Sequence, residues 1–277
     1  MQHPSDQYKE FREEFDAVIA FSIELLNAQA GHKVKNEREN YGEKIFGKMV
    51  CHAISLQRLL PSITPSEDKE IWDISSQYAL SRTILESYEA FAYIVLGELS
   101  EEEIECRILA WKLHAEERQL QMLNLIGSKN PAIQNIEKEI AQHRSELLKK
   151  EFEPYIMKHV LGKIKKGDCP DFLVPRNMRL SAGNVDIDYF KAALMQLSSH
   201  VHSHPFSLLQ LFEFKAGSEE AFTLVKVGAQ YACGFLCVSI RDMSTLFSPR
   251  VPDINSRTQL AVEKWCELLS KGVKSYF

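Results

Sequence analysis

The chain has 277 residues, of which 45% are hydrophobic and 26% are charged, the usual mixture for a globular protein. Its 33 basic and 38 acidic residues give a net charge of −5, which excludes a global basic field for nucleic acid but not a local basic patch. The 12 glycines and 10 prolines are few for this length, which disfavours a turn-rich all-β fold and favours long helices.

The chain shows no signal for export or membrane insertion. The first residues lack a basic segment followed by an apolar one, and no uninterrupted apolar run approaches the roughly 20 residues that cross a bilayer. Cys233 and Cys237 are spaced i, i+4 in an apolar run, which matches neither a redox nor a zinc-ribbon motif. We therefore expect reduced, mostly buried thiols and a cytoplasmic protein without membrane association.

Apolar residues recur every three or four positions along most of the chain, whereas the alternation typical of strands is absent. No repeat or shift in composition marks a domain boundary. We therefore predict one all-α domain over residues 1–277, a bundle of about eight helices. The expected helices cover about residues 5–30, 45–60, 65–97, 100–126, 131–150, 187–202, 218–247 and 254–274, with short helical pieces at 153–162 and 206–214 and an ordered connection over 163–188.

The helix predicted over 65–97 is expected to be buried at the centre of the bundle. Its start is indicated by Thr64-Pro-Ser-Glu-Asp68, in which proline follows a capping residue and acids occupy the first turn. A helix that is apolar on nearly every face is surrounded by other helices. Between residues 71 and 96 its only charged residues are Asp73, Arg82, Glu86 and Glu89.

Arg82 and Glu86 are i, i+4 neighbours on this apolar helix, so their side chains lie one above the other. Burying two charges is costly unless each finds partners, and an apolar pair of the same volume is often at least as stable. One interpretation is a buried ion pair that sets the helix register. The other is an arginine that binds a phosphate or another anion, with the carboxylate orienting it.

The second candidate segment is Ser198-Ser-His-Val-His-Ser-His204. On a helix, Ser198 and His202 are neighbours, and His200 and His204 form another pair on a different face. In an extended segment the three histidines could hold zinc, but the helical flanks and the lack of a local Cys or carboxylate ligand argue against it, so we expect no metal or cofactor. His202 is then either a helix-end histidine bonded to serine and backbone or an acid/base group in a cleft.

Arg107 and His114 lie seven residues apart on the helix over 100–126, with Trp111 between them. This spacing resembles the Arg-x(4–6)-His pattern of HEPN-type ribonucleases, in which the two residues stabilise the scissile phosphate and move the proton of the ribose 2′-OH. Ile108 departs from that pattern, because those proteins usually have a small polar residue there. We predict that Arg107 and His114 bind substrate. The alternative is a stacked Trp–Arg helix edge.

Two segments together resemble a bacterial all-helical family of unknown function. The helix over Ala79–Tyr93 is similar to that family's R-x-x-x-E helix. Pro175-Arg-Asn-Met178, then Tyr189 and Leu197–His202, is similar to its later Pro-x-x-Met turn, tyrosine and L-S-x-x-x-H helix. The resemblance covers most of 65–215 but implies no established activity; a more distant likeness joins it to HEPN-like and abortive-infection proteins. The residues that it places at one site are Arg82, Glu86, Ser198 and His202.

The leading hypothesis is a HEPN-like, metal-independent ribonuclease, or a related phosphate-directed enzyme, in stress or phage defence. Arg82 would contact phosphate and Glu86 would orient Arg82 or His202. His202 would act as acid and base, with Ser198 holding its ring. The expected partner is RNA or another phosphate-containing ligand, and a homodimer through helical faces is a further expectation. The alternative hypothesis is a non-catalytic interaction or sensor module in which the same residues form a buried polar network or an anion pocket.

Overall fold

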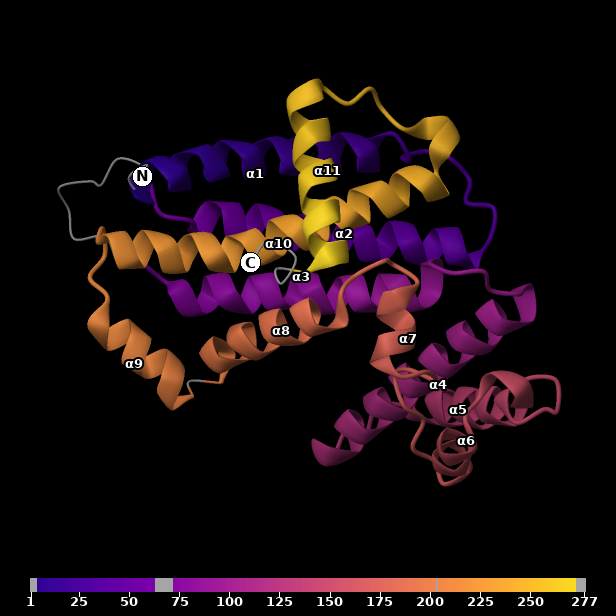
Figure 1. Ribbon diagram of the computed structural model, residues 1–277. Helices are drawn as coiled ribbons and strands as arrows, with labels where there is room; N and C mark the ends of the chain where they lie inside the picture. The colour runs from indigo at the N-terminus through magenta and orange to yellow at the C-terminus, as the bar shows by residue number, and fades with distance from the viewer. Residues whose placement is uncertain (1–3, 63–71, 203, 273–277) are drawn as a thin grey trace. The chain divides into compact units, whose positions relative to one another are not determined.

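The computed structural model describes residues 4–62, 72–202 and 204–272, except for the side chains of residues 4, 211–213 and 249. Every regular element in these ranges is a helix, which confirms the all-α prediction (Figure 1). The α-helices are α1 (Pro4–Asn27), α2 (Glu37–Leu59), α3 (Ile74–Val95), α4 (Glu101–Leu125), α5 (Ile133–Leu147), α6 (Lys158–Lys165), α7 (Arg176–Ser181), α8 (Ile187–Val201), α9 (Pro205–Glu213), α10 (Glu219–Leu246) and α11 (Ser256–Lys271).

The described ranges thus hold 11 α-helices, where the sequence predicted about eight. The three further helices are short: α6 and α9 correspond to the predicted helical pieces, and α7 lies in the segment expected to be a connection. Six residues complete fewer than two turns, too few to show a periodicity. The predicted helix start at Thr64–Asp68 lies outside the described residues. Instead, the Asp73 carboxylate accepts the Ser76 N–H at 2.9 Å just before α3.

The capping serines behave as local sequence rules require. The Ser100 hydroxyl accepts the Glu103 N–H at 3.1 Å, and the Ser218 hydroxyl accepts the Ala221 N–H at 3.2 Å. Each bond satisfies one of the backbone donors that a helix leaves unpaired in its first turn. The starts of α4 and α10 are therefore determined by residues within the same turn.

The chain forms two compact units, one of residues 1–95 and 180–277 (unit 1) and one of residues 96–179 (unit 2). The prediction of a single domain over 1–277 stays a prediction.

Within unit 1, two helices share the central position. The helix α3 packs against α2, α8 and α10, and α10 packs in addition against α1 and α11 (Figure 1). The expectation that the helix over 65–97 alone forms the centre is therefore too simple. The two helices approach closely because Gly228 has no side chain: a Cβ there would lie 2.4 Å from the Tyr78 ring. The Tyr78 hydroxyl donates to the Leu224 carbonyl at 2.9 Å across this contact.

The helix α10 is the one described helix that is long and apolar enough to cross a membrane, and 72% of its most apolar window is buried inside the protein. Its buried residues include Cys233 and Cys237, as expected for structural thiols. A core helix of a bundle has this same length and composition. The burial of α10 is what gives unit 1 a continuous apolar centre.

Unit 2 has its own core, built between α4, α5 and α6. The helix α4 packs against α5, and the segment between α6 and α7 returns to α4. Cys106, Leu109, Ala110 and Leu113 of α4 supply one side of this core. The buried members of the core of unit 2 are Cys106, Leu109, Ala110, Leu113, Ile136, Ile140, Leu147, Phe152, Ile156, Val160, Ile164, Cys169 and Leu173.

Candidate functional site

In unit 1 the structure brings Arg82, Glu86 and His202 into direct contact. The Arg82 Nε and Nη2 atoms lie 3.0 and 2.9 Å from Glu86 Oε1, as the i, i+4 spacing on α3 allows. The Arg82 Nη1 atom lies 3.1 Å from His202 Nε2, although 120 residues separate them in the chain. We call these three residues the Arg82 cluster.

The Arg82 cluster is at the surface. The side chains of Arg82 and Glu86 are 24% and 44% exposed, and His202 is exposed. The sequence suggested a buried ion pair and, in the alternative hypothesis, a buried polar network. Both interpretations are wrong about burial, because these side chains are accessible to solvent. The physical reason is that the helices packed around α3 leave this strip of it open to solvent. Its charges thus keep much of their hydration, and the cost of burial does not arise.

Ser198 lies one helical turn before His202. Its hydroxyl donates to the Leu194 carbonyl at 2.5 Å, a common use of serine within a helix. Its backbone carbonyl accepts the His202 N–H at 3.2 Å. The described bonds of Ser198 thus hold the backbone of His202 and do not include one to the imidazole ring.

The geometry of the Arg82 cluster sets the protonation pattern of His202. A guanidinium N–H can only donate, so Nε2 accepts from Arg82 and the proton of the neutral ring is assigned to Nδ1. An anion that accepts the Nη1 proton of Arg82 would take the place of His202 Nε2 as the partner of the guanidinium. The cluster is thus able to exchange an internal hydrogen bond for a bound anion.

His200 and His202 point in opposite directions although they are two residues apart. His200 is 2% exposed, its Nε2 lies 3.1 Å from Gln210 Oε1, and its ring centroid lies 4.2 Å from that of Tyr78. Burial lowers the pKa of His200. The exposed His204 ring stacks on His202 with the centroids 5.6 Å apart. No three His, Cys, Asp or Glu side chains within residues 4–62, 72–202 and 204–272 gather in a way that could hold a metal ion.

The break between α8 and α9 follows from Pro205. Proline lacks the N–H that would continue α8 and is favoured at the first position of a new helix, so α8 ends at Val201 and α9 begins at Pro205. This confirms that the segments predicted over 187–202 and 206–214 are separate helices. It leaves His202 at the C-terminal end of α8, where the ring can reach Arg82 on α3.

Arg107 and His114, the predicted substrate-binding residues, lie in unit 2. Arg107 is 8% exposed and donates from Nη2 to Glu103 Oε1 at 2.7 Å. The Nδ1 atom of His114 lies 2.7 Å from the Cys169 carbonyl oxygen, so this nitrogen carries the proton and donates. His114 thus holds the segment before α7 against α4. Trp111, between them, lies against Phe172 with the ring centroids 6.3 Å apart.

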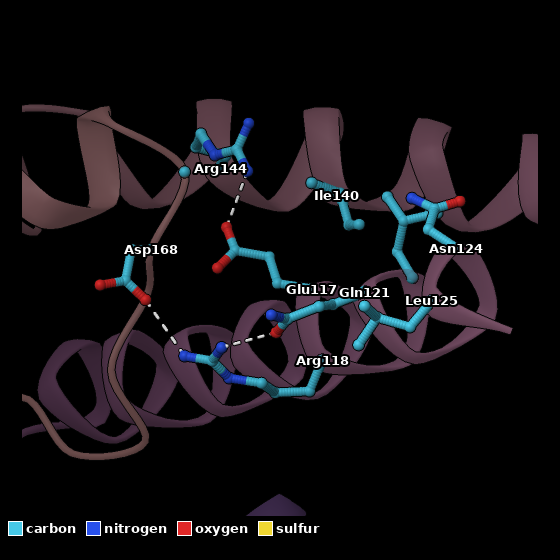
Figure 2. A pocket seen from close by; sticks show the side chains of 10 residues that line it. Glu117, Arg118, Gln121, Asn124, Leu125, Ile140, Arg144 and Asp168 are labelled. Atoms are coloured by element: carbon cyan, nitrogen blue, oxygen red, sulfur yellow. Dashed lines mark hydrogen bonds and ion pairs between the residues drawn. The ribbon is translucent and has the colours of Figure 1, made fainter.

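Unit 2 also contains a cavity of about 610 Å³ that has no counterpart in the sequence patterns (Figure 2). Its polar lining includes Arg118, Arg144 and Asp168, which come from α4, α5 and the segment after α6. These residues are too far apart in the chain to form a short motif, and no local sequence pattern marks any of them as part of a site. Only the packing of α5 on α4 makes them neighbours.

Comparisons with models of known protein families, with curated proteins and with solved structures give no match for this chain. The resemblance to a bacterial helical family therefore stays an expectation.

Proposed function

We propose that the Arg82 cluster binds a phosphate group and that the protein is a HEPN-like, metal-independent ribonuclease, or a related phosphate-directed enzyme, of stress or phage defence. The observation that carries the proposal is the contact between Arg82 Nη1 and His202 Nε2 at 3.1 Å on an accessible surface. Arginine is suited to phosphate because its planar guanidinium donates two parallel hydrogen bonds. Histidine is suited to proton transfer near neutral pH.

Binding of a phosphate would rearrange the contacts of Arg82. A non-bridging phosphate oxygen takes the N–H that Arg82 gives to His202, and Glu86 keeps the other edge of the guanidinium in place. The lone pair of His202 Nε2 is then free to accept a different proton. Without a bound anion, the hydrogen bond from Arg82 occupies the lone pair of His202 Nε2, so this nitrogen cannot accept another proton.

The cleavage step follows from these positions when the ligand is RNA. Nε2 of His202 takes the proton of the ribose 2′-OH, the 2′-oxygen forms a bond to phosphorus, and the bond from phosphorus to the 5′-oxygen breaks. The departing 5′-oxygen takes a proton from water, which leaves a 2′,3′-cyclic phosphate and a 5′-hydroxyl. The hydroxide left by that water takes the proton from His202 Nε2, which restores the neutral base. Arg82 stabilises the negative charge that accumulates on the phosphate oxygens. Ser198 acts as a positioning residue through its backbone bond to His202.

The test is cleavage of a single-stranded RNA labelled at both ends, with a chelator present. We expect Arg82→Ala and His202→Ala each to lower the rate by roughly 10²- to 10⁴-fold, the usual effect of removing such a group. His32→Ala is the matched control, because it removes an exposed histidine that is not part of the Arg82 cluster and has no role in the proposed step. Unchanged RNA cleavage and unchanged growth inhibition in both cluster variants would refute the proposal.

The open position of the Arg82 cluster favours one second candidate, a non-catalytic sensor that binds a phosphate-containing ligand without cleaving it. An exposed cluster excludes water poorly, and catalysis usually benefits from that exclusion. In this case wild-type protein would bind the labelled RNA in a fluorescence-anisotropy titration, Arg82→Ala would weaken binding, and no variant or wild-type sample would cleave it.

A further inference from the structure

The cavity of unit 2 is a second site with its own chemistry, and it goes beyond the proposed function. Its polar end combines Glu117 and Arg118 of α4 with Arg144 of α5 and Asp168 (Figure 2). Its volume of about 610 Å³ lies within the roughly 300–1,000 Å³ of small-molecule sites. All the residues that line it belong to unit 2.

Two hydrogen bonds fix the wall of this cavity in place. His114 donates to the Cys169 carbonyl at 2.7 Å, and the Cys169 N–H donates to Glu117 Oε2 at 2.7 Å. Gly167, with a φ of +83°, turns the chain there and places its backbone close to the Arg144 guanidinium, since a Cβ at this position would lie 3.5 Å from Nη2. The segment that carries Asp168 is therefore held on α4 at two points.

The polar end has more hydrogen-bond donors than acceptors. Arg144 gives Nη2 to Glu117 Oε1 at 2.7 Å. Its Nε is enclosed and has no hydrogen-bond partner among the described residues, so a ligand can reach only the outer nitrogens of this guanidinium. Arg118 gives Nη1 to Gln121 at 2.8 Å and Nη2 to Asp168 at 3.1 Å. Both carboxylate oxygens of Glu117 are already used. Because each guanidinium has five N–H groups, an acceptor supplied by a ligand is the natural complement.

The other end of the cavity is lined by aliphatic side chains together with the amide side chain of Asn124. Leu120 and Leu125 of α4 and Ile140 of α5 line it, and Figure 2 shows Leu125 and Ile140 on the side away from Asp168. Leu125 is 80% exposed, which leaves apolar surface in water that a ligand could cover. The cavity is therefore amphipathic, with charged donors at one end and aliphatic side chains at the other.

We propose that this cavity binds an organic carboxylate with an apolar body, such as a medium-chain fatty acid. The carboxylate takes the unused N–H groups of Arg144 and Arg118, and the chain lies along Leu120, Leu125 and Ile140. A monoanion fits better than a phosphate dianion, because Glu117 and Asp168 contribute two negative charges to the same cavity. A cationic amphiphile lacks the acceptors that the arginines require.

The experiment is isothermal titration calorimetry of the full chain with octanoate, octyltrimethylammonium and inorganic phosphate. We expect octanoate to bind, and to bind more tightly than either other probe. Arg144→Gln should weaken octanoate about tenfold or more, as loss of a charged hydrogen-bonding partner does. Arg118→Gln and Leu125→Gln, at exposed positions where the fold tolerates change, should each weaken it several-fold.

Lys138→Gln is the matched control, because it removes an exposed positive charge from α5 without touching the cavity, and it should leave octanoate affinity unchanged. Circular dichroism melts of every variant establish that it is folded. The proposal is overturned if octanoate does not bind at millimolar concentration, if phosphate or the ammonium probe binds more tightly, or if folded Arg118→Gln and Leu125→Gln bind octanoate as wild type does. None of these outcomes depends on RNA cleavage.

Discussion

At the C-terminal end of α8, one histidine faces solvent and another faces the protein interior, and their surroundings differ. On the outer side, His202 contacts Arg82, and both groups are accessible to water. On the inner side, His200 is enclosed by Gln210 and Tyr78, and Tyr78 in turn rests against Gly228. A buried polar group is costly unless it is bonded, and the His200 ring is bonded through Nε2 while its Nδ1 has no hydrogen-bond partner among the described residues. An exposed group can exchange its partners with water or a ligand. The packed inner side is therefore expected to contribute to stability, and the accessible outer side is where the proposed binding would take place.

The largest effect is expected from Gly228→Ala. The new Cβ would lie 2.4 Å from the Tyr78 ring, so α3 and α10 must separate or the ring must move. We expect a loss of about 2–3 kcal/mol in the free energy of unfolding, measured by urea denaturation. Gly47→Ala is the control, because its Cβ would meet only Leu26, at 3.8 Å, and should be neutral or stabilising. If Gly228→Ala lowered the free energy of unfolding no more than Gly47→Ala does, the contact between α3 and α10 would not be tightly packed.

The next effect is expected from His200→Ala. This change removes the ring that contacts Tyr78 and the bond to Gln210, and it leaves a cavity. We expect the free energy of unfolding, measured by urea denaturation, to fall by about 2 kcal/mol. His202→Ala is the matched control, since it removes the same side chain from the outer side. A loss as large in the control would contradict the assignment of stability to the inner side.

A smaller effect is expected from acidification. Burial lowers the pKa of His200, so between its folded and unfolded pKa values the unfolded chain binds more protons than the folded one. This contribution to stability is fully present above the unfolded pKa of about 6.5 and is lost as the pH falls below it. Stability measured from about pH 7.5 to about pH 5 should therefore decline less steeply in His200→Gln than in wild type. Parallel curves would count against a neutral, buried His200.

The smallest effect on stability is expected at the outer side. Arg82→Ala breaks a partly exposed ion pair and the contact with His202, and pairs of this kind contribute roughly 0–1 kcal/mol. The melting temperature should therefore stay close to that of wild type while RNA cleavage or RNA binding is lost. A loss of more than about 2 kcal/mol would instead make the cluster a structural latch between α3 and α8.

Contacts within one or two turns were predictable from the sequence. The caps at Ser100 and Ser218 and the break before Pro205 depend on groups a few residues apart, and so does the pairing of Arg82 with Glu86. Backbone geometry alone brings such groups together. The resemblance named His202 as a companion of Arg82, and helix spacing placed residues 200 and 202 on different faces. No local rule could say that the face of His200 would be buried and the face of His202 exposed.

The sequence by itself determined the all-helical class, most helix positions and the local pairs, because helix formation depends on short-range periodicity and capping. Tertiary structure alone decided that α10 shares the centre with α3, that Arg82 and Glu86 face solvent, and that Arg118 and Arg144 meet around a cavity. Burial depends on which helices pack together, and those helices are far apart in the chain. The chemistry available to each charged residue is set by that packing.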